Sequence, residues 1–334
     1  MADLPRIAVT IGDPCGIGPE VVVKALATPE LLNSLNVVLV GSAEVIAATA
    51  KQLQSPFRIV RITTLDEAIY DHGTLPVLDI IDFDTSTVLP GRLSVESGRA
   101  SVEWVLQAGR LAISNEVDAI ATAPINKEAA RLAGYTEVGH MELLQTLSGA
   151  PKVATMLVSG KLRVVHLTTH KSLSEACKAV TQEHVLEKIV LTHDAFVSWG
   201  FEGPRVGVAA LNPHASDGGL IGSEEACEIE PACVRARELG INATGPVPAD
   251  IVFHQAIMGD YDVVLAMYHD QGHIPIKVYG FEESVSVNLG LPFVRTSVDH
   301  GTAFDIAGKG VAIPTSMVEA VLLAGKLASG KGLG

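Results

Sequence analysis

Residues 6–20 read RIAVTIGDPCGIGPE, and this stretch decides the fold. RIAVTI (6–11) is a short apolar run rich in β-branched residues, which is typical of a buried strand, and a glycine-rich loop follows it. Pro19 and Glu20 then suit the first turn of a helix, because proline fits the first helical position and an acidic side chain favours the helix N-terminus. The stretch therefore predicts a strand, a loop and a helix, in that order.

The same unit recurs along the chain. Further apolar runs precede loops and helical patterns at NVVLVG (36–41), VDAIATA (117–123), LRVVHLT (162–168), PRVGVAAL (204–211) and YDVVLAM (261–267). This alternation predicts an α/β fold with a mostly parallel sheet, helices on both of its faces and right-handed crossovers. Because 334 residues exceed the usual size of one core, we expect two domains, the first at 1–130 with 301–334 and the second at 131–300.

The composition limits the partners and the compartment. The net charge of −14 argues against nucleic acid and anionic membranes, which need a basic surface, so an anionic substrate requires local basic groups. The four cysteines form no CxxC pair, and the first residues lack the basic and apolar segments of an export signal. With no apolar stretch long enough to span a bilayer, we expect a cytoplasmic protein with reduced thiols.

Three apolar strands each run into a histidine. VVHLTTH ends at His170, VAALNPH at His214 and VVLAMYH at His269. Because the carboxyl ends of parallel strands line the ligand crevice of an open sheet, these three imidazoles are predicted to converge on a metal ion, with Asp270 as a fourth ligand or an orienting group. The alternative is that each is a loop histidine bonded to backbone groups.

Other polar positions fall at strand ends and glycine-rich turns. Gly12 lies in a turn that either approaches a ligand or only packs on the sheet, since its spacing matches no dinucleotide or phosphate-loop motif. Asn126 and Lys127, in APINKEA, either bind an anion or form a capped helix start. NPHASDGG offers Asn212, Gly218 and Gly219 for close approach of a cofactor.

Two later segments are unusually polar beside apolar strands. HDQGHIPIK (269–277) contains Lys277, and GLPFVRTSVDHGTAFD (290–305) contains Arg295. Polar groups this dense are expensive to place near a core unless they have a function, which favours a site over a buried ion-pair network.

These motifs together resemble a known family. GDPCGIGPE, APINKEA, GHMELL, TTHKSL, LNPHASDGG, GPVPAD, MYHDQGHIPIK and GLPFVRTSVDHGTAFDIAGKG occur in this order and look like the 4-hydroxythreonine-4-phosphate dehydrogenase family of pyridoxal phosphate biosynthesis. The resemblance covers nearly the whole chain. NKEA and HDQGHIPIK look closer to a sister group that oxidises 4-phospho-D-threonate or 4-phospho-D-erythronate.

The resemblance implies an isocitrate/isopropylmalate dehydrogenase-like fold of two α/β/α lobes with an interlobe cleft, in a homodimer whose partner subunit completes the active site. It implies that the second lobe carries the metal site and the dimer contacts. The cofactor would be NAD, the metal would be zinc, with magnesium or cobalt as alternatives, and its ligands would be His170, His214 and His269. Substrate contacts would fall on His140, Lys277 and Arg295.

Two positions depart from the family pattern. Met141 stands where the family has Thr, and VSVNLGLPF places Ser286 at the usual substrate-binding Asn. Because residues two apart in a strand share a face, Asn288 is the candidate to supply that amide. Relatives that act on cis-dihydrodiol carboxylates from aromatic degradation keep the metal and hydride chemistry while altering this pocket, so they give the second candidate function.

We therefore expect metal-dependent oxidation of a hydroxyl on a phosphorylated four-carbon acid by NAD, followed by decarboxylation where the ketone lies β to a carboxylate. Asp250, Asp270 and Lys277 are candidates for the base. A metal-dependent hydrolase also fits three histidines and an aspartate, but it would turn over without NAD. A two-lobed binding protein would bind tightly without turnover.

Overall fold

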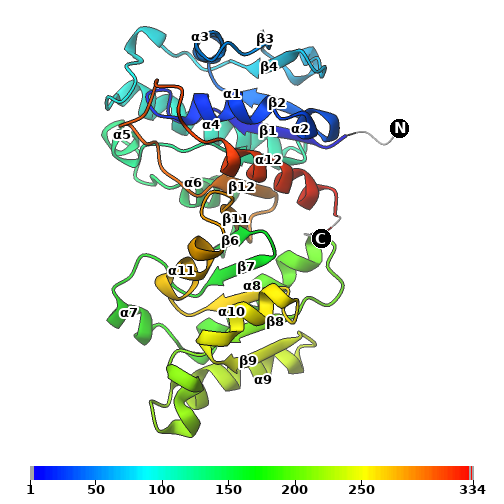
Figure 1. Ribbon diagram of the computed structural model, residues 1–334, viewed down its shortest axis with the longest axis vertical. Coiled ribbons are helices and arrows are strands. Elements are labelled where there is room, and N and C mark those ends of the chain that lie inside the picture. The colour runs from blue at the N-terminus through cyan, green and yellow to red at the C-terminus, as the bar shows by residue number, and fades with distance from the viewer. Residues whose placement is uncertain (1–3, 331, 333–334) are drawn as a thin grey trace. The chain divides into compact units, whose positions relative to one another are not determined.

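The computed structural model describes residues 4–330 and residue 332 (Figure 1). Packing divides the chain into two compact units, and the divisions fall after Pro151 and after Gly290. Leu291–Ser329 returns to the first unit. The sequence placed these divisions at residues 130 and 300.

The first unit contains a parallel sheet. Its strand order is β3-β4-β2-β1-β5-β12, and each neighbouring pair in this order is parallel. The strands are β1 (Arg6–Thr10), β2 (Asn36–Val40), β3 (Arg58–Ile62), β4 (Thr74–Leu78), β5 (Ala119–Thr122) and β12 (Val294–Val298). The helices are α1 (Gly18–Leu26), α2 (Pro29–Ser34), α3 (Ala43–Gln52), α4 (Val95–Ile113), α5 (Lys127–Leu132), α6 (His140–Ser148) and α12 (Thr315–Ala328), with short 3-10 turns η1 (Leu65–Glu67) and η2 (Thr85–Thr87).

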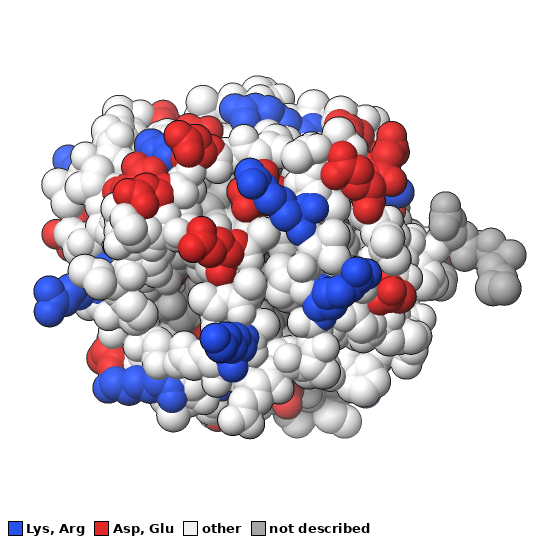
Figure 2. All heavy atoms as spheres, turned by 90° about the horizontal axis from the view of Figure 1, so that it is seen from above, with Lys and Arg blue, Asp and Glu red and all other residues white. Residues whose placement is uncertain are grey.

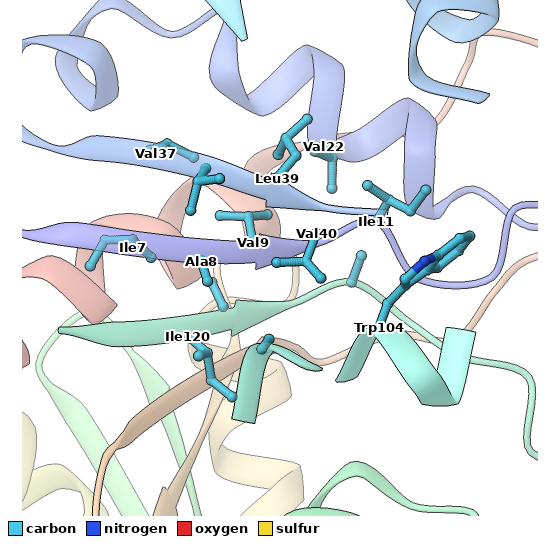
Figure 3. Close-up of a cluster of buried hydrophobic side chains, with 14 of the residues drawn as sticks. Ile7, Ala8, Val9, Ile11, Val22, Val37, Leu39, Val40, Trp104 and Ile120 are labelled. Atoms are coloured by element: carbon cyan, nitrogen blue, oxygen red, sulfur yellow. The ribbon is translucent and has the colours of Figure 1, made fainter. Parts of the chain in front are cut away.

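The core of this unit lies on both faces of β1. Ile7, Ala8 and Val9 are successive residues that point to opposite faces, and all three are fully buried. Figure 3 shows them packed among side chains of β2, α1 and α4, including the ring of Trp104. Burial on both faces explains why the strand sequences are continuous apolar runs.

The second unit contains a mixed sheet with the order β11-β6-β7-β10-β8-β9. Strand β6 is antiparallel to both β11 and β7, whereas the pairs β7-β10, β10-β8 and β8-β9 are parallel. The strands are β6 (Ala154–Ser159), β7 (Leu162–His166), β8 (Val206–Ala209), β9 (Ala243–Val247), β10 (Val263–Ala266) and β11 (Val285–Leu289). The helices are α7 (Leu173–Lys178), α8 (Gln182–Ser198), α9 (Glu230–Glu238), α10 (Ala249–Met258) and α11 (His269–Tyr279), with a 3-10 segment η3 (Pro213–Gly219) and a π-helical turn η4 (Glu225–Ile229).

The six strands predicted from apolar runs are confirmed as β1, β2, β5, β7, β8 and β10, and the α/β fold class is confirmed with them. The remaining strands were missed because polar residues or proline interrupt their patterns. Strand β9 (ATGPV) contains Pro246, and β12 (VRTSV) alternates apolar and polar side chains. Their identity as strands depends on pairing with neighbours.

Charged side chains of both signs are interspersed on the face of the molecule drawn in Figure 2. Within residues 4–330 and residue 332, no helix combines the length and the apolar character needed to cross a membrane.

The turn between β1 and α1 encloses a carboxyl group. Gly12 has φ of +71°, and a Cβ there would lie 2.5 Å from the carbonyl oxygen of Pro124, so this position requires glycine. Asp13 is fully buried. Its Oδ1 accepts a hydrogen bond from the backbone N–H of Cys15 at 2.8 Å, and its Oδ2 has no partner among the described residues. Burial raises the pKa of Asp13 to about 6.

We expect this carboxyl group to weaken the fold as the pH rises. Between the unfolded pKa of 3.8 and the folded value of about 6, the folded state binds the proton more tightly, so stability falls as the pH rises through this window. The free energy of unfolding lost across this window, complete above pH 6, is on the order of 3 kcal/mol. Asp13→Asn should remove it.

Urea unfolding of both proteins between pH 4 and pH 8 measures the effect. The exposed Asp66→Asn serves as the control. Parallel stability profiles of wild type and Asp13→Asn would contradict the assignment.

Candidate functional site

The loop between β10 and α11 is held by one buried side chain. Gln271 accepts a hydrogen bond from the backbone N–H of Met267 through Oε1, and its Nε2 donates to the carbonyl oxygen of Ala210, both at 2.7 Å. The amide thus ties the end of β10 to the residue that follows β8. This bridge fixes the first turn of α11, where His269 lies.

Two of the predicted metal ligands lie together in the second unit. The ring centroids of His170, in the loop after β7, and His269 are 6.1 Å apart. Two imidazoles bonded to one zinc ion at about 2.0–2.1 Å have centroids roughly 5–6 Å apart, so this spacing fits a shared cation. Asp270 Oδ1 lies 2.7 Å from Nδ1 of His269. A proton on Nδ1 leaves the lone pair on Nε2, as in carboxylate–histidine–metal arrangements.

His214 is not part of this pair. It lies in η3, where His214–Gly218 all have φ between 50° and 70°, a left-handed conformation that is costly for residues other than glycine. Its side chain is 69% exposed, and its nearest acidic neighbour is Asp217, at 3.9 Å. Within the described part of the chain, no three His, Cys, Asp or Glu side chains stand close enough to share a metal. One chain therefore assembles two of the three predicted ligands.

Sequence reasoning missed two histidines that support His269. The ring of His273 stacks on that of His269, with centroids 3.6 Å apart and an angle of 13° between the planes. Nδ1 of His273 also lies 3.1 Å from Nε2 of His166, which ends β7 and is 2% exposed. Burial, followed by the neighbouring His273 and His269, lowers the pKa of His166 to about 3, so this ring is neutral. The spacing of four residues between 269 and 273, which places side chains on one helical face, was the available signal.

The first unit holds a buried cation beside a histidine. Arg295 on β12 is 4% exposed, and its Nε and Nη2 donate to Oγ1 of Thr122 at 3.1 and 2.6 Å. Burial lowers the pKa of Arg295 to about 9, so the guanidinium is charged at neutral pH. Nε2 of His140 is enclosed and has no hydrogen-bond partner among the described residues. Burial and then Arg295 hold the pKa of His140 well below its usual value, with a smaller effect of Lys127.

This arrangement is suited to an anion. A buried arginine presents several donors in a fixed geometry, and His140 begins α6, where helical N–H groups attract negative charge. Met141 is the next residue of the same helix. The first unit therefore brings together His140 and Arg295, two of the substrate contacts that the sequence named.

Ser286, which departs from the family pattern, and Asn288, which could replace the missing amide, lie on β11. Ser286 pairs with Leu157 and Asn288 with Thr155, so both β11 side chains share a face of the strand. Asn288 is 2% exposed, and its Nδ2 lies 3.5 Å from Oγ1 of Thr155. Ser286 stands where the family has an asparagine. Asn288 therefore carries an amide on the same face of the strand as the missing one.

Two of the residues predicted to bind the cofactor, Asn126 and Asn212, have structural roles in this conformation. Asn126 caps α5 by accepting a hydrogen bond from the backbone N–H of Ala129, and Lys127 is exposed at the start of that helix. Nδ2 of Asn212 donates to Glu224 and Glu225 at 2.8 and 2.9 Å. The contacts of Asn126 and Asn212 need no ligand to account for them, and the same holds for the turn at Gly12. A role of these residues in cofactor binding stays a prediction.

Gly218 and Gly219 differ from these. Both have positive φ, and a Cβ at either would meet no atom within 4 Å, so open space surrounds their backbone. This leaves room for a ligand beside η3.

The three candidate bases differ in their surroundings. Asp250 is exposed in the first turn of α10. Asp270 is engaged with His269, which favours an orienting role. Lys277 lies two turns beyond His269 on α11, and its Nζ is 4.9 Å from the ring centroid of Phe281.

Comparison with known proteins gives a consistent result. The family model of the pyridoxal phosphate biosynthetic protein PdxA matches residues 33–324. A protein of Fusobacterium nucleatum named "Putative D-threonate 4-phosphate dehydrogenase" is 45% identical over 97% of each chain. The crystal structure of 4-hydroxythreonine-4-phosphate dehydrogenase from Klebsiella pneumoniae superimposes with a TM-score of 0.90, at 41% identity over 97% of this chain and 99% of that one.

A more distant relative has the name of the second candidate function. The structure of a terephthalate 1,2-cis-dihydrodiol dehydrogenase from Burkholderia xenovorans has a TM-score of 0.69 and 32% identity over 97% of this chain and 98% of that one. All three relatives are dehydrogenases by name. The family match over most of the sequence and the high identity show that this chain belongs to the PdxA family of dehydrogenases.

Proposed function

We propose that this protein oxidises a secondary hydroxyl of a phosphorylated four-carbon acid with NAD, using a divalent metal. The substrates in view are 4-phospho-D-threonate, 4-phospho-D-erythronate and 4-phosphohydroxy-L-threonine. The observation that carries the proposal is the pair His170 and His269, whose rings lie 6.1 Å apart with Asp270 bonded to His269. The names of the Fusobacterium and Klebsiella relatives support the substrate class.

His170 and His269 would hold the metal, and His214 would be its third ligand. A metal held by these residues would supply a Lewis acid for the substrate hydroxyl, and NAD would supply the hydride acceptor. Zinc fits the nitrogen ligands, and cobalt or magnesium are alternatives. Asp270 keeps the His269 ring oriented. Lys277, two turns beyond His269 on α11, would bind a substrate carboxylate or take the hydroxyl proton.

Arg295 and His140 would bind the phosphate. The guanidinium carries its charge into a buried place where water cannot compete, which strengthens charge-assisted hydrogen bonds. The enclosed Nε2 of His140 would donate to a phosphate oxygen once the charge of the bound anion draws a proton onto the ring. A ketone formed β to a carboxylate would then lose carbon dioxide.

A second copy of this chain would complete the metal site. The exposed side of α11 and the residues after it carry Ile274, Val278 and Phe281, which are 58%, 82% and 70% exposed. A row of large apolar side chains is typical of a surface that another protein covers. This row would be the surface through which the second copy binds, and partner residues would complete the metal site. Location in the cytoplasm stays a prediction of the sequence.

The second candidate is oxidation of a cis-dihydrodiol carboxylate. It is favoured by Ser286, which removes an amide from the expected pocket, and by the likeness to the Burkholderia enzyme. This candidate shares the metal and the hydride transfer, so the two differ only in the substrate.

The direct test supplies metal-loaded protein with NAD and each candidate acid, and follows nicotinamide absorbance and carbon dioxide release. We expect reduction of NAD with a phosphorylated acid, loss of activity with a chelator and recovery with zinc or cobalt. His214→Ala should lower kcat by about 100-fold or more, because the metal loses one of its three proposed ligands.

The exposed His254→Ala is the matched control and should retain activity. Turnover only with a cis-dihydrodiol carboxylate would select the second candidate. Turnover without NAD would indicate a hydrolase, and binding without turnover would indicate a binding protein.

Replacing Arg295 tests phosphate recognition. Arg295→Met removes the charge while filling the buried space, and we expect KM for the phosphorylated substrate to rise by roughly 10- to 100-fold, the value of one or two charged hydrogen bonds. Arg295→Lys keeps the charge but loses the two-pronged hydrogen-bonding geometry, so its KM should lie between those of the wild type and Arg295→Met.

Steady-state kinetics with the phosphorylated acid and its dephosphorylated analogue measure the effect. The analogue should be used equally poorly by all three proteins. An unchanged KM in a folded Arg295→Met protein would remove Arg295 from the site.

Replacing Val278 tests the second copy. Val278→Glu places a charge in the apolar row, and we expect the dimer to dissociate at least about tenfold more readily, with weaker metal retention. Light scattering across a concentration series measures the mass. Val197→Glu, at an exposed valine on α8, is the control. A wild-type protein that stays monomeric at all concentrations would contradict the proposal.

A further inference from the structure

The ring of His269 is confined on two sides. Asp270 contacts its Nδ1 edge at 2.7 Å, and His273 covers one ring face at a centroid distance of 3.6 Å. A histidine side chain rotates about two bonds, and a contact at one nitrogen leaves the ring plane free to tilt. The stacked ring restricts that tilt. The two contacts together leave Nε2 as the available nitrogen of His269.

His273 is itself anchored to the sheet. Its Nδ1 lies 3.1 Å from Nε2 of His166 and 3.1 Å from the carbonyl oxygen of His269. His166 is 2% exposed at the end of β7, and its centroid is 4.5 Å from that of His273. A buried ring at the end of a central strand cannot move without disturbing the core, so it is a rigid support for His273.

The backbone is arranged to permit this contact. A Cβ at residue 272 would lie 2.3 Å from Nε2 of His166 and 2.8 Å from Cγ1 of Val164. Glycine at this position therefore allows α11 to approach β7 closely enough for the two histidines to meet. Figure 1 shows α11 lying beside β6 and β7 in the second unit. A larger residue at 272 would push the first turns of the helix, with His269 and His273, away from the strand.

We propose that His273 is a positioning residue, which packs flat on His269 and rests on His166, so that Nε2 of His269 points toward His170 before any metal binds. The inference rests on the proposed function in taking His269 as a ligand. Preorganisation of this kind raises affinity because the protein does not have to order the ring when the ion arrives.

The first measurement uses the metal-free full-length protein. Long-range proton–nitrogen spectra of histidine-labelled protein report the ring state of His269, whose signals are assigned by their loss in His269→Asn. We expect one tautomer, with the proton on Nδ1, in the wild type, and broadened or mixed signals in His273→Leu. Unchanged His269 signals in His273→Leu would overturn the proposal, whether or not the protein binds a metal.

The second measurement is cobalt affinity by calorimetry. We expect His273→Leu to weaken cobalt binding by about tenfold, the usual effect of removing a residue that supports a metal ligand. His254→Leu, at an exposed histidine of α10, should bind like the wild type. His273→Phe keeps a flat ring and loses the contact with His166, so it should show a smaller loss, and it replaces the leucine variant if that protein does not fold.

Thermal unfolding of the metal-free variants separates positioning from a merely structural role. A lower melting temperature with unchanged cobalt affinity of the folded protein would overturn the proposal. Failure of the proposed function looks different: the wild type would bind no cobalt, or His170→Ala and His269→Asn would bind it equally well, while the ring signals of His269 would still respond to His273→Leu.

Discussion

The burial of parallel strands on both faces is the constraint on which this structure depends. Strands such as β1 and β10 are mostly apolar because helices cover both sides of each sheet, and a polar group along their length loses its solvation. The candidate metal ligands therefore lie in the segments that follow the strands. In the second unit, His170 follows β7, His214 follows β8 and His269 follows β10.

The histidine pair shows how such loops become rigid enough to bind an ion. Gln271 ties the start of α11 to the neighbouring loop, and Asp270 and His273 confine the ring of His269. The segment around His214 has the opposite character: His214, Gly218 and Gly219 are exposed, and His214–Gly218 have a costly left-handed backbone conformation. In the proposed dimer, the partner subunit would complete a site that joins this pair to such a loop.

The first unit contains a buried positive charge, the guanidinium of Arg295, beside His140. Nε and Nη2 of this guanidinium donate to Oγ1 of Thr122. Burial lowers the pKa of Arg295, and the nearby carboxylate of Glu142 partly opposes that effect. A buried charge is expensive, and an anionic ligand beside it would recover part of the cost. Burial, and then the positive charge of Arg295, also hold the pKa of His140 well below its usual value. An acidic protein thus keeps a local positive charge, which suits the anionic substrate proposed here.

The sequence by itself determined the α/β class, six of the strands and the family, because apolar runs and motifs can be read along the chain without knowledge of their partners. It also placed the candidate ligands at strand ends, and the structure brings His170 and His269 together. Strands β9 and β12 escaped because their residues acquire strand character only through pairing. The tertiary structure alone decided that Asn126 caps a helix, that Glu224 and Glu225 hold Asn212, and that His273 lies between His166 and His269. Those contacts join residues up to 107 positions apart, and no periodicity in the chain records which distant side chain will be the neighbour.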